Sequence, residues 1–327
     1  MNGKSNLSWR IGMVMMFLCT ALVLTVLPAA ADYSADKELT QKYSGTITGD
    51  MNYTIGDSYY SPKMWSNNTG NLYTASLPQA IPAAGTSVVK ARLYVYWTWS
   101  YNADESSGVI PEMNVTFDGT SFIAPNSNYN DTKGSDPYNY PSGTYCYDVT
   151  NLINPSSAVD HIVTVHNNHD SDEKWSFNIQ AVGLVVAYND SSSNTQKDYW
   201  IDEGCDMTYT KWNATTESWE YGYDPEETTC TAHFSNVNNN NVNSATLITV
   251  APAAGTIYNR LYFNNNYWDG IWDGSPRDSN FSWDITNVAN YLNSGENLVK
   301  FRNGLENSNH STEGQMQAAN AFLLVTH

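Results

Sequence analysis

The sequence has little positive charge. It holds 15 lysines and arginines against 33 aspartates and glutamates, so its formal net charge is −18 at pH 7. Phosphate contacts need Lys and Arg side chains, so the shortage argues against nucleic acid as a partner. It argues equally against adhesion to an anionic membrane surface. The polarity comes mainly from Asn, Ser, Thr, Tyr and Gly, since only 15% of the residues are charged.

The common catalytic motifs are also missing. The chain contains no Gly-x-Ser-x-Gly, no His-Glu-x-x-His, no phosphate-binding loop and no pair of cysteines at zinc-site spacing. We therefore expect no catalytic activity and no cofactor. A pair of carboxylates for glycoside hydrolysis stays open, because their separation cannot be read from sequence. The candidates lie in unrelated contexts: Glu105, Glu112, Glu203 and Glu217.

Only one apolar run approaches the length of a membrane span. It covers residues 11–27, follows Lys4 and Arg10, and precedes Ala29-Ala30-Ala31. This pattern predicts a signal peptide, residues 1–31, cleaved after Ala31; an uncleaved anchor is the alternative. We expect the mature chain to have no transmembrane segment and to be secreted to the extracellular cell surface.

Cysteine is scarce, at four residues. Cys19 lies inside the predicted signal peptide, which leaves an odd number in the mature chain. Exported cysteines tend to pair, and we expect a disulfide between Cys205 and Cys230. Cys146 is then the odd one, and it is either a bridge to another chain or a buried free thiol.

What the sequence does contain is a repeated series of motifs. Four pairs occur in the same order, at varying separation: Gly49–Thr54 with Cys205–Thr210, "PAAGT…ARLY" from Pro82 with "PAAGT…NRLY" from Pro252, Tyr147–Leu152 with Trp283–Val288, and Ile179–Tyr188 with Met316–Val325. Varying separations indicate loop insertions rather than a repeat of fixed period. We predict an internal duplication, with one copy at 32–190 and the other at 191–327.

Each copy reads as β-strands. In "VVKARLYVYWTW", Val89 and every second residue after it are apolar, which is the period of a strand. "AVGLVVAY" and "AFLLVTH" are apolar throughout, as in central strands buried on both faces. Short strands separated by Asn, Gly and Asp turns predict an all-β fold: two tandem jelly-roll-like antiparallel β-sandwich domains.

The order of these motifs resembles a known family. "ARLYVYW", "YDVTNL", "GLVVAY", "YWIDEG", "NRLYFNN", "WDITNV" and "NAFLLV" are similar to an uncharacterised domain found in exported and surface proteins of methanogenic archaea. The resemblance covers nearly the whole mature chain. It implies a β fold and a cell-envelope setting, and it supplies no catalytic residue.

Two groups of residues suggest ligand sites. Asp269, Asp273 and Asp278 lie among glycines, an arrangement that suits calcium, although plain turn chemistry explains it too. Trp99 and Trp272 end strands where exposed rings could form a carbohydrate-binding platform, although core packing is the alternative. Calcium is therefore the exception to the expected absence of a cofactor.

Sequons for N-glycosylation are frequent. They begin at Asn52, Asn67, Asn114, Asn130, Asn189, Asn213, Asn280 and Asn309. Such acceptors agree with export, although an Asn-rich chain forms some of them by chance.

Two functions remain open. The leading hypothesis is a structural protein of the cell envelope, a sheath or surface-layer subunit that self-associates or binds other envelope proteins through open strand edges. The alternative is a secreted carbohydrate-binding module with wall or extracellular polysaccharide as its ligand.

Overall fold

The structure is almost entirely β. The computed structural model describes residues 35–66, 70–79, 81, 85–132, 140–155, 159–169, 174–219, 224–274, 281–305 and 310–327. Its elements run from β1 to β22, with one short 3-10 helix, η2 (Ala289–Tyr291). The predicted signal peptide lies outside the described residues. In the described part, no helix has the length and apolar character needed to cross a membrane.

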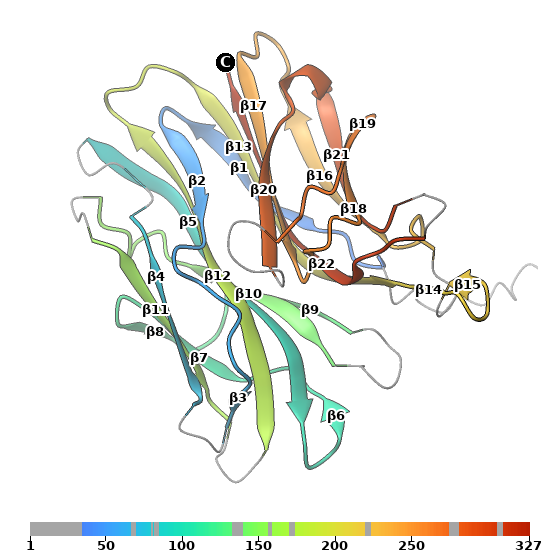
Figure 1. Ribbon diagram of the computed structural model, residues 1–327. Coiled ribbons are helices and arrows are strands. Elements are labelled where there is room, and N and C mark those ends of the chain that lie inside the picture. Colours follow the sequence, from blue (N-terminus) through green and yellow to red (C-terminus); the bar gives the residue numbers. More distant parts are fainter. Residues whose placement is uncertain are drawn as a thin grey trace, which may run out of the picture. The chain divides into compact units, whose positions relative to one another are not determined.

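Two β-sandwiches make up the described chain (Figure 1). The inner sheet of the first runs β2-β12-β5-β10-β9, with bounds Asp50–Thr54, Trp175–Asp190, Thr86–Asn102, Ser142–Asp148 and Ser127–Asp131. β3 (Met64–Trp65) and β6 (Ser107–Gly108) extend it. The outer sheet runs β4-β11-β7-β8, with bounds Leu72–Leu77, His161–Asn167, Met113–Phe117 and Thr120–Phe122.

The second sandwich is built in the same way. Its inner sheet runs β1-β13-β22-β17-β20, with bounds Thr40–Ile47, Lys197–Thr210, Gly314–Thr326, Ser244–Pro252 and Phe281–Asn287. Its outer sheet runs β16-β21-β18-β19, with bounds Thr229–Val237, Gly295–Asn303, Asn259–Phe263 and Asn266–Asp269. A small hairpin, β14 (Trp212–Asn213) with β15 (Ser218–Trp219), stands apart from both sheets.

Eight strands in each sandwich share one connectivity. They are β2, β4, β5, β7, β8, β10, β11 and β12 in the first, and β13 and β16 to β22 in the second. Counted along the chain, strands 1-8-3-6 form the inner sheet and strands 2-7-4-5 the outer sheet in both. This eight-stranded, two-sheet arrangement is that of a jelly roll and confirms the predicted β-sandwich fold. The duplication event itself stays a prediction.

One of the four sequence matches joins strands that are not equivalent. "ARLY" lies in β5, the third strand of the first sandwich, whereas "NRLY" lies in β18, the fourth strand of the second. The counterpart of β5 is β17: Gly183 faces Tyr94 across β12 and β5, and Asn320 faces Val250 across β22 and β17. The other three matches fall on equivalent strands, so the "PAAGT" match is a similarity of sequence alone.

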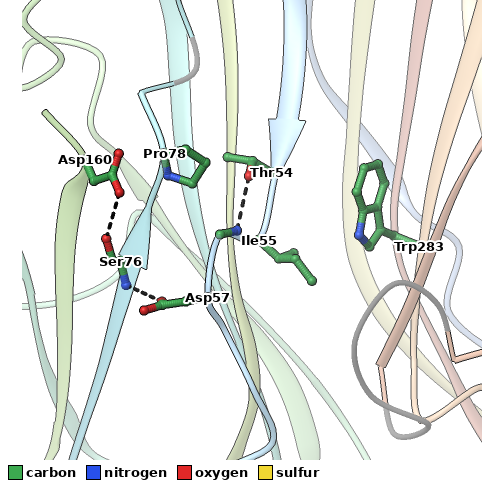
Figure 2. Close-up of a pocket in the computed structure, with 8 residues that line it drawn as sticks. Thr54, Ile55, Asp57, Ser76, Pro78, Asp160 and Trp283 are labelled. Carbon is green, nitrogen blue, oxygen red and sulfur yellow. Dashed lines mark hydrogen bonds between the residues drawn. The ribbon is translucent and has the colours of Figure 1, made fainter. Parts of the chain in front are cut away.

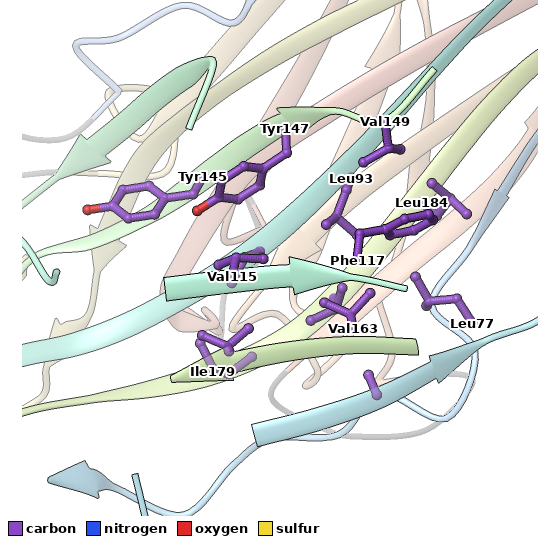
Figure 3. Close-up of a cluster of buried hydrophobic side chains, with 14 of the residues drawn as sticks. Leu77, Leu93, Val115, Phe117, Tyr145, Tyr147, Val149, Val163, Ile179 and Leu184 are labelled. Carbon is purple, nitrogen blue, oxygen red and sulfur yellow. The ribbon is translucent and has the colours of Figure 1, made fainter. Parts of the chain in front are cut away.

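The alternation in β5 places its two faces in different cores. Ala91, Leu93, Val95 and Trp97 pack inside the first sandwich, part of which Figure 3 shows. The opposite face, with Tyr94 and Tyr96, is also buried, but against the second sandwich. Both faces of β12 and β22 are buried as well, as predicted for central strands.

The two inner sheets therefore pack on each other. A third core between them contains Met51, Tyr94 and Val185 from the first sandwich and Val250 and Phe322 from the second. The strand β1 precedes the first sandwich in sequence but pairs with β13 of the second. The described residues from 35 to 327 consequently form one compact unit of four β layers.

Candidate functional site

A buried ion pair joins the two sandwiches. Arg92 Nε donates to Glu203 Oε1 at 2.8 Å and Arg92 Nη2 to Glu203 Oε2 at 2.9 Å, and both side chains are 0% exposed. Tyr94 Oη adds a third donor to Glu203 Oε1 at 3.1 Å. Although burial opposes the charge, the bonds to Glu203 raise the pKa of Arg92. A carboxylate bound in this way is withheld from solvent, so Glu203 acts here as a structural group.

A chain of hydroxyl groups continues across the same junction. Tyr53 Oη and Tyr96 Oη are 3.0 Å apart, and Tyr96 Oη donates to Asn320 Oδ1 at 2.7 Å. The ring of Tyr53 meets the indole of Trp283 edge to face, with centroids 5.3 Å apart. Trp283 belongs to β20, so these contacts lead from the buried junction to a residue at its margin.

An open cleft of about 560 Å³ lies beside Trp283 (Figure 2). The first sandwich supplies most of its lining: Thr54, Ile55, Gly56, Asp57, Ser76, Pro78 and Asp160. Trp283 is the contribution of the second sandwich. The cleft therefore exists only where the two sandwiches meet.

A tight turn fixes the carboxylates of the cleft. Gly56 follows β2 with φ of +54°, and a Cβ there would lie 2.1 Å from the carbonyl oxygen of Ser76, so the turn requires glycine. Ser76 N donates to Asp57 Oδ1 at 2.5 Å, and Ser76 Oγ donates to Asp160 Oδ2 at 3.2 Å. Both acids are thereby positioned around one residue of β4.

This arrangement suits a polar ligand with an apolar face. An indole ring offers a flat surface for the C–H face of a sugar, and carboxylate oxygens accept hydrogen bonds from hydroxyl groups. The indole N–H of Trp283 is buried and has no hydrogen-bond partner among the described residues, so the ring contributes its apolar face and not a donor. The cleft thus combines an apolar platform with fixed acceptors, the usual composition of a small-molecule site.

The predicted platform of Trp99 and Trp272 needs a correction. Trp272 is 0% exposed: its ring stacks on Phe301 at 5.1 Å, and its Nε1 donates to Thr249 Oγ1 at 3.1 Å. A side chain with no exposed face cannot stack on a sugar, so Trp272 is a core residue. Trp99 is partly buried beside Tyr140, and its role stays a prediction.

The predicted calcium loop is described only in part. Asp278 lies outside the described residues. Both oxygens of Asp269 accept hydrogen bonds from Arg260, at 2.5 and 3.0 Å, so a guanidinium already occupies that carboxylate. Burial raises the pKa of Asp284, and the negative charge of nearby Asp273 raises it further. Calcium at this loop stays a prediction.

Cys146, Cys205 and Cys230 are buried free thiols in the structure. Cys146 is 0% exposed in the core between the inner sheets, and burial raises its pKa well above its ordinary value. A thiol in that position is covered by both inner sheets, which favours the buried free thiol, and the bridge from Cys146 to another chain stays a prediction. Cys205 and Cys230 interact electrostatically with each other, and their disulfide stays a prediction.

The sequons divide into two groups. Asn67, Asn280 and Asn309 lie outside the described residues. Asn114 is exposed, and the others are partly buried: Asn52, Asn130, Asn189 and Asn213. Asn189 and Asn213 already accept backbone hydrogen bonds through their side-chain oxygens, Asn189 from Thr48 and Asn213 from Thr215. Use of the sequons stays a prediction.

Sequence reasoning missed the cleft. Trp283 was recognised only as part of a repeated motif, and the Gly56-Asp57 pair gives a signal for a turn but none for a ligand. The cleft brings together segments around positions 55, 77, 160 and 283. Nothing in one sequence reveals that convergence.

Comparison with known proteins gives one family. A model described as "Protein of unknown function (DUF3344)" matches residues 32–326. No curated protein sequence matches the chain.

Similar solved structures are distant. They include PNGase F, a glycosylasparaginase from Flavobacterium meningosepticum (10% identity, 87% of this chain and 96% of that one, TM-score 0.24). An uncharacterized protein from Listeria monocytogenes EGD-e has 12% identity over 77% of this chain and 19% of its own, with a TM-score of 0.23. The major capsid protein of mavirus has 8% identity over 93% and 91%, with a TM-score of 0.18. Likenesses at these TM-scores carry no argument about function.

Proposed function

The chain belongs to the DUF3344 family, and we propose that it is an exported, non-catalytic protein that binds a saccharide in the cleft between its two sandwiches. One observation carries the proposal: the partly exposed ring of Trp283 faces a cleft whose other wall holds the carboxylates of Asp57 and Asp160. The ring accepts the apolar face of a sugar residue. The carboxylates accept hydrogen bonds from its hydroxyl groups.

The proposal also explains why the site sits at the junction. The inner sheets pack through a buried core and the Arg92–Glu203 pair, so the two walls of the cleft hold a fixed separation. A preformed site loses less conformational entropy on binding than a flexible one. Asp57 and Asp160 each accept a hydrogen bond from Ser76, which fixes the position of both carboxylates. We therefore assign both to ligand binding.

Glycan binding is tested with the purified chain on an oligosaccharide panel, followed by calorimetry on the best ligand. Trp283→Ala and Asp160→Asn should each weaken binding at least about tenfold, since each removes a direct contact. Trp99→Ala is the matched control and should bind as the unmodified chain does. Oligosaccharide binding that survives Trp283→Ala but is lost in Trp99→Ala would instead place the site at Trp99, as predicted from the sequence.

Turnover is tested on the same panel by following the release of reducing sugar and of free glycan. We expect none from the unmodified chain over a day. Product formation that Asp160→Asn abolishes would show that the cleft is catalytic and would contradict the non-catalytic part of the proposal.

A second candidate is the envelope subunit expected from the sequence. The observation that favours it is the edge strand β20, on which Ile285 is 55% exposed. An open edge with an apolar side chain can pair with another chain. Light scattering at rising protein concentration should then show assembly that Ile285→Lys reduces, whereas a monomer at every concentration would remove this candidate.

A further inference from the structure

Three carboxylates from distant parts of the sequence converge away from the cleft. Asp36 precedes β1, Asp131 ends β9 and Asp206 lies in β13, and oxygen atoms of all three lie within 4.8 Å of one another. Asp131 and Asp206 are buried, whereas Asp36 is exposed. The group is therefore open to solvent on the side of Asp36. Three carboxylates in so small a volume repel one another, and positive charge among them relieves that repulsion.

Asp206 supplies an independent observation. Its side chain is 0% exposed, and among the described residues no N–H or O–H group donates to either carboxylate oxygen. The thiol of Cys230 beside it is only a weak donor, and Lys37 acts on Asp206 through its charge without donating a hydrogen bond to it. A buried carboxylate left without partners is strongly unfavourable, so such a group usually has a ligand or a proton.

The local backbone aims this carboxylate at the other two. The ladder between β13 and β22 is irregular between Glu203 and Asp206, which breaks the alternation of side chains there. Gly204 lies in that bulge, and a Cβ on it would come within 3.1 Å of Leu39. The absence of a side chain lets the segment before β1, which carries Asp36, lie against β13.

The group already holds one positive charge. Lys37 Nζ lies 2.7 Å from Asp131 Oδ1 and also donates to the carbonyl of Asn130 at 2.8 Å. Met207 N donates to Asp131 Oδ2 at 2.8 Å, so Asp131 is well supplied with donors while Asp206 is not. The Lys37 side chain is 44% exposed and has room to leave the carboxylates.

We propose that Asp36, Asp131 and Asp206 bind one divalent cation that prefers oxygen ligands, with Lys37 displaced when it binds. Calcium and manganese take carboxylate and water oxygens at such sites, and the exposed side at Asp36 admits the water ligands. This site is distinct from the saccharide cleft, with which it shares no residue. It is also distinct from the loop at Asp269 and Asp273.

Calorimetry on the full chain, stripped with EDTA, tests the site with calcium, manganese, magnesium and zinc chlorides in turn. We expect one calcium or manganese ion per chain. Asp206→Asn should weaken that binding at least about tenfold. Asp36→Asn should weaken it too, and because Asp36 is exposed this variant leaves the core untouched. Lys37→Met should tighten it, since it removes a competing charge.

The controls separate the proposal from its rivals. Asp269→Asn removes the other candidate calcium ligand and should leave the affinity unchanged. Binding that is unaffected by Asp36→Asn and Asp206→Asn would overturn the proposal, and so would no binding of any of the four ions. Binding of zinc alone, lost in Cys230→Ser, would assign a thiolate site instead and would overturn the choice of an oxygen-preferring cation.

Discussion

At the scale of single residues, the junction depends on the charge pair of Arg92 and Glu203. Removing one partner leaves the other charge buried without compensation. We expect Arg92→Met to lower the free energy of unfolding by about 3–5 kcal/mol. Lys174→Met is the matched control, since Lys174 and Asp104 form a 3.5 Å pair with side chains 60% and 50% exposed. Such a surface pair contributes about 0–1 kcal/mol. Urea denaturation measures both, and equal losses would contradict the account.

The buried carboxyl group of Asp202 should make the free energy of unfolding depend on pH. Burial raises its pKa from 3.8 to about 8, against the opposing effect of the His233 backbone N–H. The folded state then binds a proton that the unfolded state has released, so this group's contribution to stability falls as pH rises from about 4 to about 8. Asp202→Asn should remove this contribution to the pH dependence of the free energy of unfolding, which is on the order of a few kcal/mol between about pH 4 and pH 8. Urea denaturation at pH 5 and pH 8 checks it, and parallel profiles for both proteins would refute it.

At the scale of strands, Gly143 sets how closely β10 approaches its neighbours. A Cβ at Gly143 would lie 2.3 Å from the ring of Trp97 in β5 and 2.5 Å from the carbonyl of Tyr129 in β9. Gly143→Ala should therefore cost about 1–3 kcal/mol of unfolding free energy. Gly70→Ala, where no atom of the described neighbours lies within 4 Å of the added carbon, is the control. Thermal melts of the two variants that shift equally would count against this packing.

Strand periodicity predicted a large part of the fold. The alternation of apolar residues in β5 predicted which side chains share each face of the strand. The unbroken apolar runs predicted that β12 and β22 are central strands. Both predictions were possible because each pattern reflects local burial. The second face of β5 carries Arg92 and tyrosines, so sequence alone does not distinguish it from a solvent-facing side. The "PAAGT" match failed for a related reason: identical letters can precede strands that belong to different sheets.

The candidate site was less accessible to prediction than the fold. Trp272 was expected at the end of a strand with an exposed ring, but its indole fills the core of the second sandwich. Trp283 gave no such signal, yet it lines the cleft. Exposure depends on which sheets pack together, and one sequence does not contain that information.

At the scale of the whole molecule, three cores in a continuous stack should unfold together. Phe322 lies in the core between the inner sheets, and Phe301 lies in the core of the second sandwich. Each substitution to Ala should cost about 3–5 kcal/mol and shift one shared transition. Tryptophan fluorescence and far-UV circular dichroism should give coincident curves for both variants. Two separated transitions in Phe322→Ala would show that the sandwiches unfold independently.

The central claim is that one saccharide contacts both sandwiches at once, and hydrogen exchange followed by mass spectrometry tests it most directly. With a ligand from the panel bound, peptides covering the turn after β2 and peptides covering β20 should both exchange more slowly than in the free protein. Slower exchange in only one of these segments, or only around Trp99, would contradict a ligand seated between the two sandwiches.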